Sequence, residues 1–169
     1  MKLAAILATF VSCTGLADAQ NANPMVDALA KHYQASKELT LAVADAMPAE
    51  NYSFKATDAE MSFGEQMNHI ASANANYCAA GLETKSPLGK LDDNSKATAE
   101  KNLNTAFDFC LDGLKKLNDA ALTKMVGSGA RQSTVFERLW GGFTHTAHHR
   151  GQAEVYLRLK GITPPQYKF

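Results

Sequence analysis

The sequence has 169 residues, with 17 Lys and Arg against 17 Asp and Glu, and 46% of it is hydrophobic. A domain typically has ~100–200 residues, so this length indicates a single domain that can bury a substantial core. Zero net charge without a Lys/Arg-rich run argues against nucleic acid as a partner. The apolar content excludes a disordered chain, and no stretch approaches the roughly 20 apolar residues of a membrane span.

The first nineteen residues have the pattern of a secretory signal peptide. Lys2 provides a positive charge, Leu3–Val11 is almost entirely apolar, and Ala17–Ala19 fits a small-x-small cleavage site. We therefore expect residues 1–19 to be removed. Residues 20–169 would then form the domain of an exported protein, either periplasmic or secreted.

Two features of the cysteines depend on export. A loose lipobox before Cys13 offers an alternative in which this residue becomes a lipid-anchored N-terminus, although Phe10 fits that motif poorly. Cleavage after residue 19 leaves Cys78 and Cys110, which lie on different predicted helices. In an oxidising compartment these two form either one disulfide or two buried thiols, and the sequence favours neither.

Two helices are predicted in the first half of the domain. Asn23 followed by Pro24 is typical of a helix start, and the helix should end before Pro48. The second helix begins with a capping box, in which Ser62 caps and Glu65 reaches back. Helical spacing of apolar residues follows, and the stop is expected near Gly81.

The second half predicts two more helices and two long connections. The third helix runs from about Ser95 to Leu117, after a polar connection over 82–94 that is long enough for a crossover. A loop over 118–132 leads to a second capping box at Thr134, and Gly161 ends the fourth helix. The apolar side expected for this fourth helix comprises Val135, Phe136, Leu139, Trp140, Phe143, Val155 and Leu159.

No segment alternates strictly between apolar and polar residues over more than a few positions. The fold class we predict is therefore all-α, a four-helix bundle with a long crossover between its second and third helices.

The histidines carry the chemical signal. His145 and His149 are four residues apart, so they share one helix face and can bind one metal ion. His69 lies in the second helix between apolar neighbours and is the best candidate for a third ligand, since a bundle brings such side chains to a common interior point. His148 lies about 100° around the helix from His149 and should be exposed. His32 lacks a partner motif.

Each of these assignments has a plainer alternative. A His-x-x-x-His pair is often a set of surface or hydrogen-bonded residues without metal. Gln152 and Tyr156 extend the same face, either as hydrogen-bond partners of the ligands or as packing residues. Glu65, one turn before His69, could serve as a catalytic base or fourth ligand, but the capping box is its more ordinary use.

Two parts of the chain resemble a known family. Residues 145–152 read HTAHHRGQ and residues 156–165 read YLRLKGITPP, which is similar to the C-terminal signature of the DinB-like superfamily. Residues 47–55 (MPAENYSFK) and 61–70 (MSFGEQMNHI) resemble the entry to the family's second helix. The resemblance covers nearly all of 20–169 and implies a four-helix bundle with a crossover between helices two and three.

The same resemblance implies a divalent metal held by three histidines, which correspond here to His69, His145 and His149. Two departures are visible: Ala56 stands where the family often has proline, and the leader is unlike the mostly cytosolic members. Characterised relatives include transferases and isomerases that use low-molecular-weight cytosolic thiols, which suit an exported protein poorly. Members of the family often pair, which implies a homodimer.

Three imidazoles leave a coordination position open, as in catalytic zinc sites. Zinc suits an all-histidine site, and nickel, iron, copper and manganese are alternatives. The function we expect is a metal-dependent hydrolase or transferase acting on an unidentified small molecule. The alternative is a non-catalytic exported bundle that binds metal or serves a structural purpose.

The leader yields a direct test. Exported protein should begin at Gln20, because signal peptidase cleaves after the small residues 17–19. Mass measurement of the N-terminal peptide checks this, and a lipidated Cys13 would contradict it.

Overall fold

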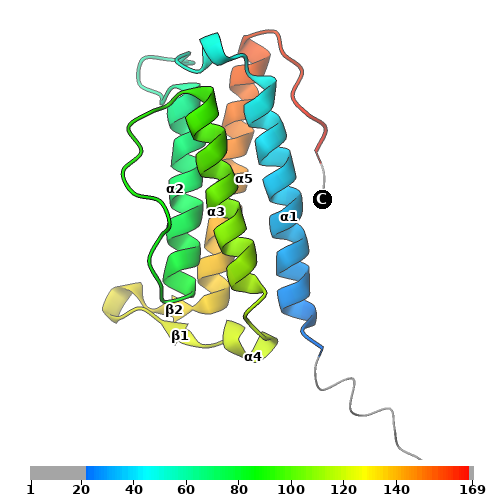
Figure 1. The fold of residues 1–169 in the computed structure, drawn as a ribbon, viewed down its shortest axis with the longest axis vertical. Coiled ribbons are helices and arrows are strands. Elements are labelled where there is room, and N and C mark those ends of the chain that lie inside the picture. The colour runs from blue at the N-terminus through cyan, green and yellow to red at the C-terminus, as the bar shows by residue number, and fades with distance from the viewer. Residues whose placement is uncertain (1–21, 168–169) are drawn as a thin grey trace, which may run out of the picture.

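The computed structural model describes residues 22–167. Four long helices run along its long axis (Figure 1). They are α1 (Pro24–Ala46), α2 (Phe63–Gly81), α3 (Lys96–Leu114) and α5 (Val135–Leu159). The predicted all-α four-helix bundle is confirmed. Within the described residues, no helix is both long and apolar enough to cross a bilayer.

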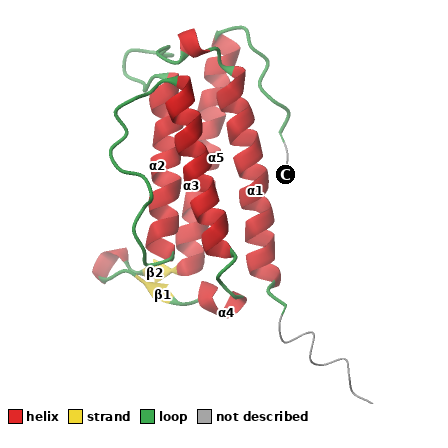
Figure 2. Cartoon of the chain, in the orientation of Figure 1, coloured by secondary structure: helices red, strands yellow, loops and turns green. Residues whose placement is uncertain are grey.

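The connection between α2 and α3 sets the topology. It leaves the end of α2 and returns along the outside of the bundle to the level where α2 began (Figure 2). As a result α2 and α3 run in the same direction, whereas α5 runs antiparallel to α2. The predicted crossover is therefore confirmed, and α2 packs against both α5 and α3.

Helix starts were partly predictable. Both capping boxes are present, Ser62 with Glu65 and Thr134 with Glu137. The start of α1 differs from the expectation, because the Asn23 side chain does not cap it. Instead the carboxylate of Asp119 accepts hydrogen bonds from the first backbone N–H groups of α1, at 3.0 and 2.9 Å. A negative charge is favourable at this helix end.

The segment predicted as a loop over 118–132 has short regular elements. It contains α4 (Asp119–Leu122) and β1 (Met125–Val126), and β1 pairs antiparallel with β2 (Ser133–Thr134). Leu122 and Val126 are buried and attach this hairpin to the end of the bundle. Two-residue strands are too short to show an alternating pattern, so the sequence could not reveal them.

The buried face of α5 is only partly the one expected: Val135 and Leu139 are buried, and Phe136 and Phe143 pack half-buried against the core. Val155 and Leu159 are 51% and 56% exposed, and Trp140 is 45% exposed. Beside apolar residues, the buried positions of α5 include small and polar ones: Val135, Leu139, Gly142, Thr146, Arg150, Ala153, Tyr156 and Leu157. The histidine positions explain the difference, since turning His145 and His149 toward α2 turns Val155 outward.

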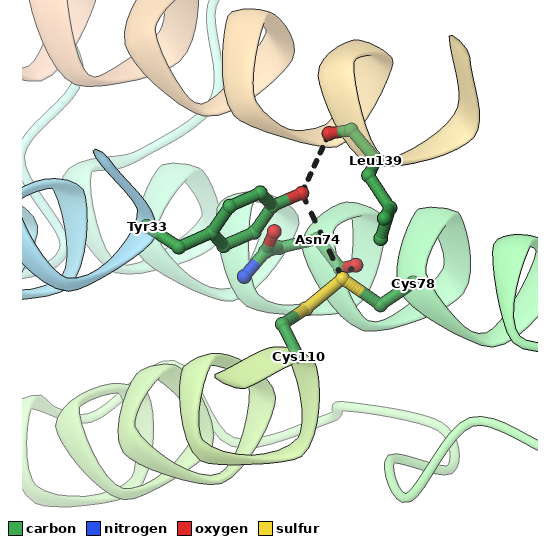
Figure 3. The surroundings of a disulfide bond; sticks show 5 residues. All are labelled: Tyr33, Asn74, Cys78, Cys110 and Leu139. Atoms are coloured by element: carbon green, nitrogen blue, oxygen red, sulfur yellow. Dashed lines mark hydrogen bonds between the residues drawn. A yellow bond between two sulfur atoms is a disulfide. The ribbon is translucent and has the colours of Figure 1, made fainter. Parts of the chain in front are cut away.

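The two remaining cysteines form a disulfide. Cys78 of α2 and Cys110 of α3 are joined with their Cα atoms 5.5 Å apart, and both are fully buried (Figure 3). Beside them, the hydroxyl of Tyr33 from α1 donates a hydrogen bond to the carbonyl of Leu139 in α5, at 2.6 Å. All four long helices are thus connected at one level of the core.

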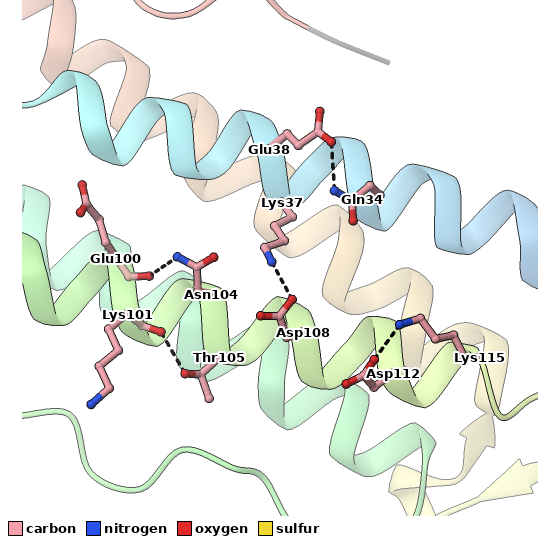
Figure 4. A network of polar contacts seen from close by, with 10 residues as sticks. All are labelled: Gln34, Lys37, Glu38, Glu100, Lys101, Asn104, Thr105, Asp108, Asp112 and Lys115. Carbon is pink, nitrogen blue, oxygen red and sulfur yellow. Dashed lines mark hydrogen bonds and ion pairs between the residues drawn. The ribbon is translucent and has the colours of Figure 1, made fainter.

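The α1–α3 face is polar and exposed. Lys37 of α1 pairs with Asp108 of α3 at 2.6 Å, and Lys115 pairs with Asp112 along α3 (Figure 4). Exposed pairs of this kind contribute little to stability, about 0–1 kcal/mol each. The Lys37–Asp108 pair joins α1 to α3, whereas the Lys115–Asp112 pair joins neighbouring positions of α3.

The predicted leader, including Cys13, lies outside the described residues.

Replacing both Cys78 and Cys110 by Ala should lower the free energy of unfolding by about 3–4 kcal/mol. The disulfide closes a loop with a sequence separation of 32, and its loss restores that loop's entropy to the unfolded chain. Urea unfolding under non-reducing conditions measures the change. Equal midpoints for wild type and the double variant would show that the bridge does not form.

Candidate metal centre

Three histidines meet where α2 and α5 cross. His69 extends from the second turn of α2, and His145 and His149 extend from successive turns of α5. Nε2 of His69 lies 3.2 Å from Nε2 of His145 and 3.1 Å from Nε2 of His149. The predicted trio is therefore brought together, although His69 is 76 residues from His145 and 80 residues from His149 in sequence.

The spacing of the nitrogens suits a metal ion. Nitrogen ligands at 2.0–2.1 Å from a tetrahedral zinc lie about 3.3 Å from one another. The three side chains are half-buried, and their ligand atoms all lie within 4.8 Å of one another. Among the described residues, no cysteine or carboxylate joins this group. The donor set is thus three imidazoles with room for an exogenous ligand.

Close packing of α5 on α2 makes this convergence possible. A Cβ at Gly141 would lie 2.9 Å from Cε1 of Tyr77, and a Cβ at Gly142 would lie 2.9 Å from Cβ of Tyr77. The pair of glycines therefore lets the α5 backbone approach α2 one turn before His145. The Tyr77 ring, 5.9 Å from the His145 ring, closes that end of the site.

Burial keeps the imidazoles neutral. Desolvation lowers the pKa of all three below the ordinary value of 6.5. For His145, repulsion from the protonated forms of His149, His69 and His148 adds to desolvation and brings the pKa to about 4. At neutral pH each histidine is therefore ready to bind a cation through a free lone pair.

His148, His149 and Arg150 point in different directions, because neighbouring residues on a helix are about 100° apart. His148 is exposed, as predicted. Arg150 is buried and donates to the hydroxyls of Ser36 and Thr40 in α1, at 3.1 and 3.3 Å. The HHRGQ motif thus serves both the site and the attachment of α5 to α1.

Gln66 is the site residue that sequence analysis missed. It is 2% exposed, and its Nε2 lies 3.0 Å from Nδ1 of His149 and 2.6 Å from Oε1 of Gln152. Gln152 in turn lies 3.2 Å from Nε2 of His148. The signal was its position three residues before His69, which places both on one face of α2. By contrast, Nδ1 of His145 is buried without a partner.

Two other predicted candidates have structural uses. The carboxylate of Glu65 accepts the backbone N–H of Ser62 at 2.6 Å, so its capping role is confirmed. The hydroxyl of Tyr156 donates to the carbonyl of Met61 at 2.7 Å, which attaches the end of α5 to the loop before α2. Tyr156 therefore packs beside the site and does not contact the histidines by a hydrogen bond.

A shallow pocket of about 350 Å³ opens beside His69, between α2 and the crossover. Its lining is mostly polar: Glu65, Asn68, His69, Ser72, Gly89, Lys90, Leu91 and Asn94. Asn68 donates to the carbonyl of Asp93 and to Oδ1 of Asn94, at 2.9 and 2.7 Å, and so fixes the crossover to α2. His69 is the one member of the histidine trio in this lining, so a small polar molecule in the pocket would lie beside His69.

Comparison with known proteins agrees with this arrangement. The model of the DinB family matches residues 19–169, which is nearly the whole chain. The chain belongs to the DinB family. This confirms the resemblance found in the sequence, and with it the fold class. No curated protein matches the chain.

Solved structures show the same fold. A DinB-like protein from Bacillus cereus ATCC 10987 superposes with a TM-score of 0.74 at 20% identity, covering 84% of this chain and 97% of that one. The DinB-like protein YjoA from Bacillus subtilis gives a TM-score of 0.71 at 22% identity, covering 83% and 97%. At this identity the likeness supports the DinB fold alone.

Metal-free protein should lose stability as the pH falls from 6.5 toward about 4. In this pH window the histidines of the unfolded chain bind protons that those of the folded protein do not, so protonation lowers the free energy of unfolding. The loss should be shallower in His145→Gln, whereas the exposed-residue control His148→Gln should follow wild type. Urea unfolding of chelator-treated proteins across this range measures the slopes, and identical slopes for wild type and His145→Gln would contradict the account.

Proposed function

We propose that this DinB-family protein is a divalent-metal-dependent enzyme of the hydrolase or transferase type. In this proposal His69, His145 and His149 bind the metal, and zinc is the preferred ion. The observation that carries the proposal is that Nε2 of His69 lies 3.2 Å from Nε2 of His145 and 3.1 Å from Nε2 of His149.

The ligand count favours catalysis over a structural role. Structural zinc sites usually have four protein ligands, whereas catalytic sites have three and leave a position for water or substrate. The described residues supply three, and one of them, His69, also lines a polar pocket. A divalent cation held there would act as a Lewis acid on a substrate that enters.

The pocket indicates a small polar substrate. The amides of Asn68 and Asn94 and the hydroxyl of Ser72 offer hydrogen bonds, and Lys90 provides a cation at the rim. Large apolar side chains are nearly absent from this lining, with Leu91 as the exception. A hydrophobic ligand would therefore find little surface to cover.

The alternative is a bundle that binds metal without turnover. Glu65 is the carboxylate beside His69 in the pocket, and its capping bond to Ser62 holds it and lowers its pKa. A hydrolase without a separate general base would depend on the metal alone to activate the attacking water. Measured turnover distinguishes the two functions.

Export is also part of the proposal. A buried disulfide is typical of proteins from oxidising compartments. The bridge between Cys78 and Cys110 therefore supports the secretory leader predicted over residues 1–19.

His145→Ala and His149→Ala should each abolish stoichiometric zinc, because two imidazoles do not make a tight site. His148→Ala is the matched control and should retain it, since its side chain is exposed beside the site. Elemental analysis of dialysed protein gives the stoichiometry. Full zinc retention in His149→Ala would overturn the ligand assignment.

Turnover is tested on the same variants with chromogenic esters, amides and phosphate esters. Zinc-loaded wild type and His148→Ala should hydrolyse at least one class, and His149→Ala should not. Zinc-loaded wild type that hydrolyses none of them favours the non-catalytic alternative.

A further inference from the structure

The hydrogen-bond chain behind His149 contains a conflict. The nitrogen of the Gln66 amide has two protons but faces three acceptors: Nδ1 of His149 at 3.0 Å, the carbonyl oxygen of His149 at 3.3 Å, and Oε1 of Gln152 at 2.6 Å. At least one of them is left without a proton. Gln66 is 2% exposed, so water cannot easily resolve the conflict.

The orientation also fixes a histidine tautomer. When Gln66 donates to Nδ1 of His149, that nitrogen is the acceptor and the proton of the neutral ring sits on Nε2. Nε2 is the atom that faces His69. A ring in this state cannot bind a metal through the nitrogen that points into the site, because its lone pair is occupied.

Reversing two amides removes both difficulties. With oxygen in place of nitrogen, Gln66 accepts a proton from Nδ1 of His149, and Nε2 becomes free. Gln152 then turns as well, so that its amide nitrogen donates to Gln66 over the 2.6 Å contact. Its oxygen accepts from Nε2 of His148 over the 3.2 Å contact. The heavy atoms keep their places. The His149 carbonyl loses the 3.3 Å hydrogen bond from Gln66, but it is a carbonyl within α5 and accepts the helical hydrogen bond.

We propose that Gln66 is a positioning residue for the metal site. Gln66 accepts the Nδ1 proton of His149 and so keeps the Nε2 lone pair of His149 directed toward the metal. Gln152 sets the direction of the Gln66 amide, because its own amide nitrogen then donates to the Gln66 oxygen. The contact of Gln152 with His148 lies at the exposed end of this chain. The inference rests on the proposed metal site, because it assigns a role only if His149 binds through Nε2. Partners of this kind orient ligand histidines, and their loss typically lowers metal affinity ~10–100-fold.

The two ligand histidines on α5 differ in whether a side chain contacts their Nδ1 atom, and Gln66 makes that contact for His149. Nδ1 of His145 is buried without a hydrogen-bond partner, so no comparable group fixes that ring. Of the two ligands on α5, His149 is therefore the one whose tautomer a neighbouring side chain sets.

Zinc affinity of the full domain, measured by competition with a chromophoric chelator, tests the proposal. Gln66→Met keeps the volume but removes the acceptor, and should bind zinc ~10–100-fold more weakly. Gln66→Glu keeps an acceptor that cannot turn into a donor, and should bind within about 3-fold of wild type or more tightly. Asn102→Ala removes another buried amide, which bonds to Asn68 and not to a histidine, and should leave the affinity unchanged.

A spectroscopic measurement separates positioning from packing. In zinc-loaded wild type and Gln66→Glu, the Nδ1 proton of His149 should appear in NMR spectra as a slowly exchanging ring N–H, and it should exchange rapidly in Gln66→Met. Equal zinc affinity in wild type and Gln66→Met would overturn the role of Gln66, and so would equal losses of affinity in Gln66→Met and Gln66→Glu. Neither result would contradict the proposed function. Wild type that binds no zinc would overturn this inference together with the proposed function.

Discussion

The antiparallel contact between α2 and α5 is the constraint on which the rest of the structure depends. Three ligands from two helices can share a point only if the backbones approach closely, and Gly141 and Gly142 provide that approach against Tyr77. The disulfide fixes α2 to α3 a little further along. The crossover follows from the same arrangement, because α2 and α3 can run in the same direction only if the chain returns between them.

This constraint also explains the composition of α5. A helix that must present His145 and His149 to α2 cannot turn its most apolar stripe inward as well. Its buried face accordingly includes Arg150, whose guanidinium bonds to hydroxyls of α1. The same orientation of α5 leaves Val155 exposed to solvent. Because the buried imidazoles resist protonation, the metal-free protein loses free energy of unfolding in acid. A bound cation would stabilise the folded state and offset this loss.

Much of this could be predicted from the sequence, because it depends on local patterns. Capping boxes and a terminal glycine fixed the starts of α2 and α5 and the end of α5. The spacing of His145 and His149 predicted a shared face. The parts that escaped prediction depend on contacts between distant segments: the Asp119 cap on α1, the pairing of the cysteines, and Gln66 behind His149. A glutamine three residues before a histidine means little until α5 is seen to cross there.

The central claim is that the three histidines bind one metal ion through Nε2. X-ray absorption spectroscopy of the zinc-loaded protein at the zinc edge tests it most directly. We expect three imidazole nitrogens at ~2.0–2.1 Å from the zinc, with the outer-shell scattering typical of imidazole rings, and one further light atom. A spectrum with fewer than three imidazoles, or with a shell of oxygen atoms alone, would contradict the claim.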